Sequence, residues 1–206
     1  MKKWLGLFFL VMFSEISYAT DSTTSNIDVF LGMRNNRYAF LGVDWNKRFG
    51  MAVENSVLVQ KVGLQYVRVA PFYHRELPYG LDVSYAIYAG SRYDREFYDF
   101  GSRLGATFKV HPRFLLLDGV FQPFYDSDMG RNVGYLFEIK SFLLPEVALF
   151  ANYKNLPEYR ALERRVSVGL LFSVSNLAVK PELSTPTDWE MHWTRVSVSF
   201  LYRYPI

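Results

Sequence analysis

Apolar and polar side chains alternate with a period of two along most of the chain. In the segment 81–90, every second residue from Leu81 to Ala89 is apolar, and the residues between them are small or polar. Successive side chains of a β-strand point to opposite faces, so this pattern predicts strands with one apolar and one polar face. The same alternation recurs at 27–34, 98–110, 132–140 and 165–174.

Turn-forming residues divide the chain into segments of about ten residues, which predicts an antiparallel arrangement of twelve strands. One set of breaks would lie at one end of the strands: Asn35-Asn36, Gln60-Lys61, Asp94-Arg95, Ser127 to Gly130, Asn155 to Glu163 and Ser184 to Asp188. The other set would lie at the opposite end: Lys47 to Gly50, Glu76 to Gly80, His111-Pro112, Leu144-Pro145 and Ser175-Asn176. The alternation breaks near Arg68, and the expected strand at 177–183 contains Pro181, so ten or eight strands remain alternatives.

The composition of the two faces separates two all-β architectures. A soluble β-sandwich should carry Lys, Glu and Thr on its outward face. Here the polar face holds many glycines, and the apolar face is aliphatic in mid-strand with aromatic residues nearer the strand ends, as in a membrane barrel with aromatic girdles. The girdle candidates are Trp45, Tyr153, Trp189, Trp193 and Tyr202.

The N-terminus differs from the rest of the chain. Lys2 and Lys3 precede an unbroken apolar run from Trp4 to Phe13, followed by the more polar segment 14–19. This run is shorter than the roughly 20 residues that a membrane-spanning helix needs, but it suits a secretory signal peptide. We therefore expect a signal peptide at 1–19, cleaved after Ala19, and one barrel domain at 20–206.

Composition narrows the function further. The formal net charge is +3, and basic residues are scattered among acidic ones without forming a stripe, so no nucleic-acid partner is expected. The chain has no cysteine and hence no disulfides. A closed barrel provides another way to complete an exported fold, because it leaves no unpaired strand edge.

The last strand carries a recognisable pattern. Counting back from the C-terminus in steps of two gives Ile206, Tyr204, Tyr202, Phe200, Val198 and Val196. This strand resembles the terminal strand of bacterial outer-membrane β-barrels, although that family usually ends in Phe or Trp. The resemblance implies an outer-membrane location and contact with outer-membrane lipid and lipopolysaccharide. It also implies an assembly signal at Phe200, Tyr202, Tyr204 and Ile206, read by the barrel-assembly machinery.

Some outer-membrane barrels are lipid-modifying enzymes, so catalytic patterns must be tested. With an even number of strands, both termini and the second set of breaks are expected on the periplasmic side. His74 and His111 fall at or near turns on that side. His192 lies near the outer rim and shares the parity of the lipid-facing Val196. The sequence shows no metal-ligand spacing, Gly-rich phosphate loop or nucleophile elbow. We predict no catalytic residue, metal or cofactor, with a lipid-modifying enzyme and a periplasmic β-sandwich binding protein as alternatives.

Charged residues of both signs lie on the polar face and would line the barrel interior. In a barrel of eight strands they would pair across a filled interior, whereas in one of twelve they could line a narrow pore. The sequence thus predicts either a passive channel for small polar solutes or a structural barrel with a salt-bridged lumen. The lining candidates are Asp28, Arg34, Asp44, Glu54, Asp82, Asp99, Arg103, Lys109, Glu138, Lys140, Lys154, Arg165, Arg195 and Arg203.

Overall fold

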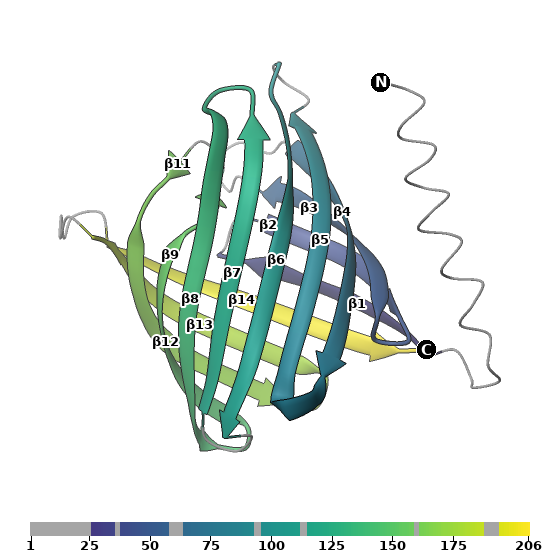
Figure 1. Cartoon of the computed structure of the whole chain (residues 1–206), viewed down its shortest axis with the longest axis vertical. Coiled ribbons are helices and arrows are strands. Elements are labelled where there is room, and N and C mark those ends of the chain that lie inside the picture. The colour runs from purple at the N-terminus through teal and green to yellow at the C-terminus, as the bar shows by residue number, and fades with distance from the viewer. Residues whose placement is uncertain are drawn as a thin grey trace.

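A computed structural model shows a closed antiparallel β-barrel of twelve strands (Figure 1). It describes residues 26–35, 38–57, 64–92, 96–111, 115–158, 161–187 and 194–206. The barrel strands are β1 (Ile27–Arg34), β2 (Tyr38–Trp45), β3 (Phe49–Val57), β4 (Leu64–Leu77), β5 (Leu81–Arg92), β6 (Tyr98–His111), β7 (Leu115–Asp126), β8 (Gly130–Leu144), β9 (Val147–Asn155), β12 (Arg165–Val174), β13 (Leu177–Pro186) and β14 (Arg195–Pro205). A 3-10 turn, η1 (Pro78–Gly80), joins β4 to β5, and a separate hairpin pairs β10 (Pro157–Glu158) with β11 (Ala161–Leu162).

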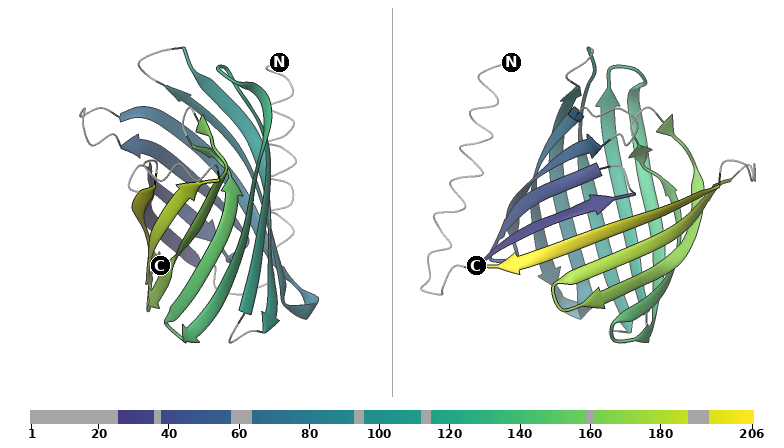
Figure 2. Two further views of the ribbon diagram at one scale, coloured as in Figure 1. Left: turned by 90° about the vertical axis from the view of Figure 1, so that its left-hand side faces the viewer. Right: turned by 180° about the vertical axis from the view of Figure 1, so that it is seen from behind.

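The barrel closes where its first strand meets its last. β14 lies beside β1, with Asp28 opposite Pro205 and Met33 opposite Phe200 (Figure 2, right). Each remaining strand pairs with its sequence neighbour in the barrel, so the ring has no free edge. The first and the last described residues of the chain therefore lie close together at one end of the barrel. The backbone amide of Ile206 donates a hydrogen bond to the carbonyl oxygen of Ile27.

At the end that carries both termini, here called the terminal end, the described turns lie at or next to the predicted breaks, but Phe49 and Gly50 of the break predicted at Lys47 to Gly50 belong to β3. Pro112 of another predicted break lies outside the described residues. Between β2 and β3, Asn46 and Lys47 have φ values of 54° and 52°, the left-handed pair of a type I′ hairpin turn. At the opposite end, the break between β7 and β8 is confirmed at 127–129. The predicted breaks at Gln60-Lys61 and Asp94-Arg95 lie outside the described residues.

The two irregular segments of the sequence both form barrel strands, which settles the strand number at twelve. Pro181 lies within β13, opposite Val198 of β14. On the β12 side, paired positions occur at Glu182 and Val179 but not at Pro181 itself, because proline has no amide hydrogen to donate. Arg68 lies within β4 in unbroken register with β3.

The outer face of the barrel is apolar in mid-strand. Leu41, Leu104 and Leu149 have exposed fractions of 55%, 49% and 49%, and Phe137 has 62%. A water-soluble protein rarely exposes so much contiguous apolar surface, whereas a barrel in a bilayer needs it. The outer face therefore contacts lipid, and the chain crosses the membrane with its strands.

None of the described residues belongs to a helix long and apolar enough to cross a membrane.

Aromatic residues gather on the outer face near both barrel ends. Trp45 and Tyr202, both half-exposed, lie near the terminal end. Tyr153 lies near the opposite end and its ring centroid is 5.7 Å from that of Tyr135. This arrangement matches the two interfacial girdles of a membrane barrel. Trp189 and Trp193, the remaining girdle candidates, lie outside the described residues.

Glycines on the inner face lie opposite aromatic side chains of the neighbouring strand. Gly42 faces Phe30 across the β1–β2 pair, and Gly50 faces Phe72 across β3–β4. A Cβ atom built on Gly42 would lie 2.2 Å from the Cζ atom of Phe30, so the ring occupies the space that a side chain would need. Each ring thereby covers the bare backbone of its partner glycine.

We expect the substitution Gly42→Ala to destabilise the barrel by about 1–3 kcal/mol, the usual cost of overpacking. The added methyl group would meet both the Phe30 ring and the carbonyl oxygen of Met51, 2.6 Å away. Gly119→Ala is the matched control, because a Cβ there meets nothing within 4 Å. The urea midpoint of the folded band in heat-modifiable electrophoresis measures both. Equal midpoints for the two variants would contradict this packing argument.

Candidate functional site in the barrel interior

Two adjoining cavities occupy the barrel interior. The larger has a volume of about 520 Å³ and the smaller about 350 Å³. Arg34, Phe40, Arg103, Leu156 and Pro157 line both, so these residues stand where the two cavities meet. The interior of the barrel is thus partly open, not filled throughout by side chains.

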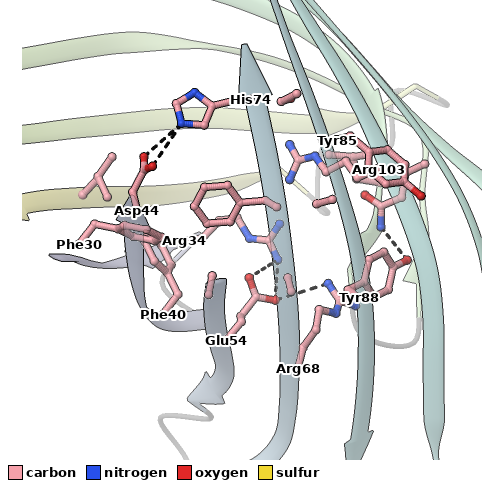
Figure 3. A pocket seen from close by; sticks show the side chains of 18 of the residues that line it. Phe30, Arg34, Phe40, Asp44, Glu54, Arg68, His74, Tyr85, Tyr88 and Arg103 are labelled. Carbon is pink, nitrogen blue, oxygen red and sulfur yellow. Dashed lines mark hydrogen bonds and ion pairs between the residues drawn. The ribbon is translucent and has the colours of Figure 1, made fainter. Parts of the chain in front are cut away.

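An ion-pair network spans four strands beside the larger cavity, and Figure 3 shows the part of it formed by Arg34, Glu54 and Arg68. The Nη2 atom of Arg34 lies 2.9 Å from Oε2 of Glu54. Arg68 contacts Glu54 at 3.5 Å and Asp99 at 2.5 Å through its two Nη atoms. The hydroxyl of Tyr66 donates to Asp99 (2.6 Å) and accepts from Nε of Arg68 (2.7 Å). Arg68 and Asp99 are therefore held on several sides, with side-chain exposures of only 14% and 6%.

Arg103 is the exception to this pairing. Its guanidinium lines both cavities, but no hydrogen bond or ion pair joins it to another of the described residues (Figure 3). The neighbouring Arg34 and Arg68 share the carboxylates of Glu54 and Asp99. Three guanidiniums thus face two carboxylates, and this part of the wall carries an excess of positive charge.

A second network lies on the wall formed by β7, β8, β9 and β13. The Nζ atom of Lys140 lies 2.6 Å from Asp118 and 3.3 Å from Glu138. Glu138 also accepts from Lys180 at 2.6 Å and from Asn152 at 2.9 Å. These charges compensate one another.

Two further sets of ion pairs lie nearer the end opposite the termini. Lys154 and Glu182 form a close ion pair between β9 and β13. Arg165 lies 2.7 Å from Glu163, and Arg195 approaches the same carboxylate at 3.7 Å. Arg165 and Arg195 thus both approach the carboxylate of Glu163.

The terminal end of the interior carries a separate group. The Nε2 atom of His74 lies 3.2 Å from Asp44, and Nη1 of Arg203 lies 3.5 Å from Asp28 and 3.7 Å from Asp44. At the rim itself, Lys109 lies 2.8 Å from Glu76 and 3.1 Å from Asp82. His74 therefore projects inward from β4 toward a carboxylate.

The structure distributes the fourteen lining candidates among these groups. Those that line a cavity are Arg34, Asp44, Glu54, Arg103, Lys154 and Arg203. Those that form ion pairs beside the cavities or nearer the barrel ends are Asp28, Asp82, Asp99, Lys109, Glu138, Lys140, Arg165 and Arg195. Their role in solute passage stays a prediction.

Sequence reasoning missed several lining residues. The alternation pattern did not identify Arg68 as a lining residue, because both faces of β4 mix apolar and polar side chains. Tyr66 and Phe72 lie on the same inner face of β4 as Arg68. Lys180 and Glu182 flank Pro181, whose strand was in doubt. Strict alternation counted from the turns would have placed all three inside, since Lys180 and Glu182 share the parity of the inward Ser184.

One connection between strands enters the interior. β9 ends at Asn155, and the next residues, Leu156 and Pro157, line both cavities. A Cβ atom on Gly134 of β8 would lie 2.8 Å from Cδ of Pro157, so the proline packs against a glycine of the wall. The first residues of this connection therefore lie where the two cavities meet.

The assembly-signal residues alternate along β14 as predicted. Tyr202, Tyr204 and Ile206 are exposed at 39%, 58% and 73%, on the opposite face from the interior Arg203. Recognition of this strand by the assembly machinery stays a prediction. His111 ends β6 at the terminal end, and His192 lies outside the described residues.

No protein-family model matches the chain, and no curated protein matches it in sequence. Solved structures do match. The KdgM porin in complex with disordered oligogalacturonate has a TM-score of 0.62 at 13% identity, covering 86% of this chain and 98% of that chain. The KdgM porin in a second structure gives 0.61 with the same identity and coverage. The NanC porin gives 0.50 at 9% identity, covering 86% of this chain and 97% of that chain.

The chain folds as an outer-membrane porin-type barrel. The likeness extends over nearly the full length of those porins and shows a shared barrel fold. The alternative of a periplasmic β-sandwich is wrong, because the twelve strands form one closed ring and not two packed sheets. At these identities, the likeness establishes the fold of this porin-type barrel and leaves its solute to be argued from its own residues.

Proposed function

We propose that this protein is a passive outer-membrane channel that favours anions. The observation that carries the proposal is the charge of the cavity walls. Six basic residues and three carboxylates line the two cavities, and Asp28, Asp99 and Glu138, just outside this lining, pair with Arg203, Arg68 and Lys180. The positive charge that no described carboxylate pairs with is that of Arg103, where the two cavities meet. The basic residues are Arg34, Arg68, Arg103, Lys154, Lys180 and Arg203, and the acidic ones are Asp44, Glu54 and Glu182.

Such an excess of positive charge in a narrow, water-accessible passage raises the local concentration of anions and lowers that of cations. Low-dielectric walls strengthen the effect because they focus the field into the lumen. Small anions should therefore pass more readily than cations of similar size. One of the compared porins is described with oligogalacturonate, so anionic saccharides belong among the solutes to test.

An enzymatic role is less well supported by this interior. Ser84 lies opposite His74 in the β4–β5 register, and His74 contacts Asp44, so the residue types of a hydrolytic triad occur together. However, no hydrogen bond joins Ser84 to His74 in the described part of the chain. A serine without a hydrogen-bonded base is not activated as a nucleophile. We therefore favour transport over catalysis.

Planar bilayers test the channel directly. With the purified barrel and a KCl gradient across the bilayer, we expect discrete conductance steps. We also expect a reversal potential that is shifted from zero toward the equilibrium potential of chloride. A barrel that gives no steps at high protein load would contradict the channel, and a potassium-side reversal potential would contradict the anion preference. An empty-detergent preparation controls for leakage.

Fractionation tests the membrane location. We expect the mature protein in the outer-membrane fraction, with a gel mobility that shifts on heating because the closed barrel resists unfolding in detergent. Recovery in the soluble periplasmic fraction without a mobility shift would contradict this location.

A further inference from the structure

The larger cavity has an apolar wall that ion conduction does not require. Phe30, Phe40 and Phe72 line it together with Ala52 and other alanines (Figure 3). The ring centroids of Phe30 and Phe40 lie 6.3 Å apart, and those of Phe30 and Phe72 lie 5.9 Å apart, so the three rings form one cluster. Porin interiors are ordinarily polar, and an aromatic cluster inside one indicates contact with something other than water.

The same cavity also presents unsatisfied cationic groups. Arg103 has no ion-pair partner among the described residues, and Nε of Arg34 is buried without a hydrogen-bond partner. Arg34 and Arg103 both line the cavity that holds the aromatic cluster. Polar groups in protein interiors are normally hydrogen-bonded, so the guanidinium of Arg103 at the cavity wall is a place where a ligand oxygen could bind.

We propose that the larger cavity is a binding site for amphipathic monoanions, namely carboxylates whose remaining body is a phenyl ring or a short alkyl chain. This inference rests on the proposed channel and names its solute class. The carboxylate accepts hydrogen bonds from Arg103, because a guanidinium matches the planar geometry of a carboxylate, and the charge of the neighbouring Arg34 adds to the attraction. The apolar body packs on the cluster of Phe30, Phe40 and Phe72, where tilted aromatic contacts are favourable.

The cavity volume of about 520 Å³ suits such a ligand. It falls in the range of small-molecule sites, about 300–1,000 Å³, which are lined mainly by apolar side chains with a few placed polar groups. A fully hydrophilic anion would form the guanidinium contacts, but the aromatic cluster would remain in contact with water. The site should therefore rank anions by their apolar area.

Isothermal titration of the full-length mature barrel in detergent provides the test, with phenylacetate, acetate, galacturonate and 2-phenylethanol as probes. Burial of a phenyl group should make phenylacetate bind at least about tenfold more tightly than acetate. Phenylacetate should also bind more tightly than galacturonate, which lacks the apolar body, and than 2-phenylethanol, which lacks the charge. Detergent without protein corrects for partition of the probes into micelles.

Variants assign the binding to this cavity. Arg103→Gln should weaken phenylacetate at least about tenfold, because it removes the charge-assisted hydrogen bonds. Phe72→Ala should weaken phenylacetate but not acetate. Lys109→Gln removes an equal charge at the terminal rim, outside both cavities, and should leave phenylacetate binding unchanged. Heat-modifiable mobility confirms that each variant folds, and Phe72→Leu replaces Phe72→Ala if the latter does not.

The outcomes separate this inference from the channel itself. Chloride conductance, recorded on the same preparation, reports the channel alone. If the barrel conducts but binds phenylacetate no more tightly than acetate, the amphipathic site is wrong and the channel stands. If phenylacetate binds with the predicted ranking but no conductance appears, the channel is wrong and the site stands. Equal loss of binding in Arg103→Gln and Lys109→Gln would overturn the assignment to this cavity.

Discussion

Replacing Arg103 by glutamate is expected to convert the channel from anion-favouring to cation-favouring, with a change of about a hundredfold in the permeability ratio. The substitution changes the charge at the junction of the two cavities by two units. At about 6 Å in a water-like dielectric, each unit changes the energy of a passing monovalent ion by about 0.7 kcal/mol. Two units therefore give about 1.4 kcal/mol for each ion, with opposite signs for chloride and potassium, so the permeability ratio changes by about 2.8 kcal/mol, or about a hundredfold. The reversal potential in a KCl gradient measures it.

Two variants control this experiment. Arg103→Lys keeps the charge and should keep the anion preference. Lys109→Glu makes the same change of charge at the terminal rim, where Lys109 lines neither cavity, and should shift the reversal potential much less. An Arg103→Glu channel that conducts with an unchanged reversal potential would show that Arg103 does not set the selectivity.

Replacing Arg68 by methionine is expected to destabilise the barrel by about 3 kcal/mol, the lower end of the cost of removing one partner of a buried ion pair. The lower end applies because water reaches the adjoining cavity. Asp99 would keep the hydrogen bond from Tyr66 but lose its cation, and it is nearly buried. The urea midpoint of the folded band in electrophoresis measures the change.

The double variant Arg68→Met/Asp99→Asn separates the charge effect from lost packing. Once the uncompensated carboxylate is neutral, much of the stability should return, because the cost lies in the unpaired charge and not in the absence of the pair. Lys109→Met, which breaks an exposed pair, should leave the midpoint nearly unchanged. A double variant no more stable than Arg68→Met would contradict the electrostatic explanation.

The sequence predicted the barrel because its signals are local. Alternation marks the strands one at a time, and turn residues such as Ser175-Asn176 mark where each strand ends. The two doubtful strands could not be settled in this way. Pro181 belongs to the barrel because its segment pairs with β14. Arg68 belongs to it because its segment keeps register with β3. Both pairings join separate segments of the chain, which a local pattern does not report.

The sequence predicted the charged wall but not its pairing. Alternation identifies Arg34, Glu54, Asp99 and Arg103 as inward, yet it cannot tell which carboxylate each guanidinium reaches. That depends on the shear of the barrel, which brings Arg68 to both Glu54 and Asp99 and gives Arg103 no carboxylate partner among the described residues. The aromatic cluster was missed for a related reason, because Phe30 and Phe72 occupy inner positions where the pattern predicts polar or small residues.

The glycines opposite these rings have a consequence for affinity. The ring of Phe30 is seated over Gly42 and that of Phe72 over Gly50, so both are fixed by the fold itself. Immobilising a free side chain at a binding interface costs about 0.5–1.5 kcal/mol. In this barrel that entropy is lost when the strands pair, before any solute arrives. The apolar wall is thus preorganised, and a solute that reaches it finds a surface that need not rearrange to receive it.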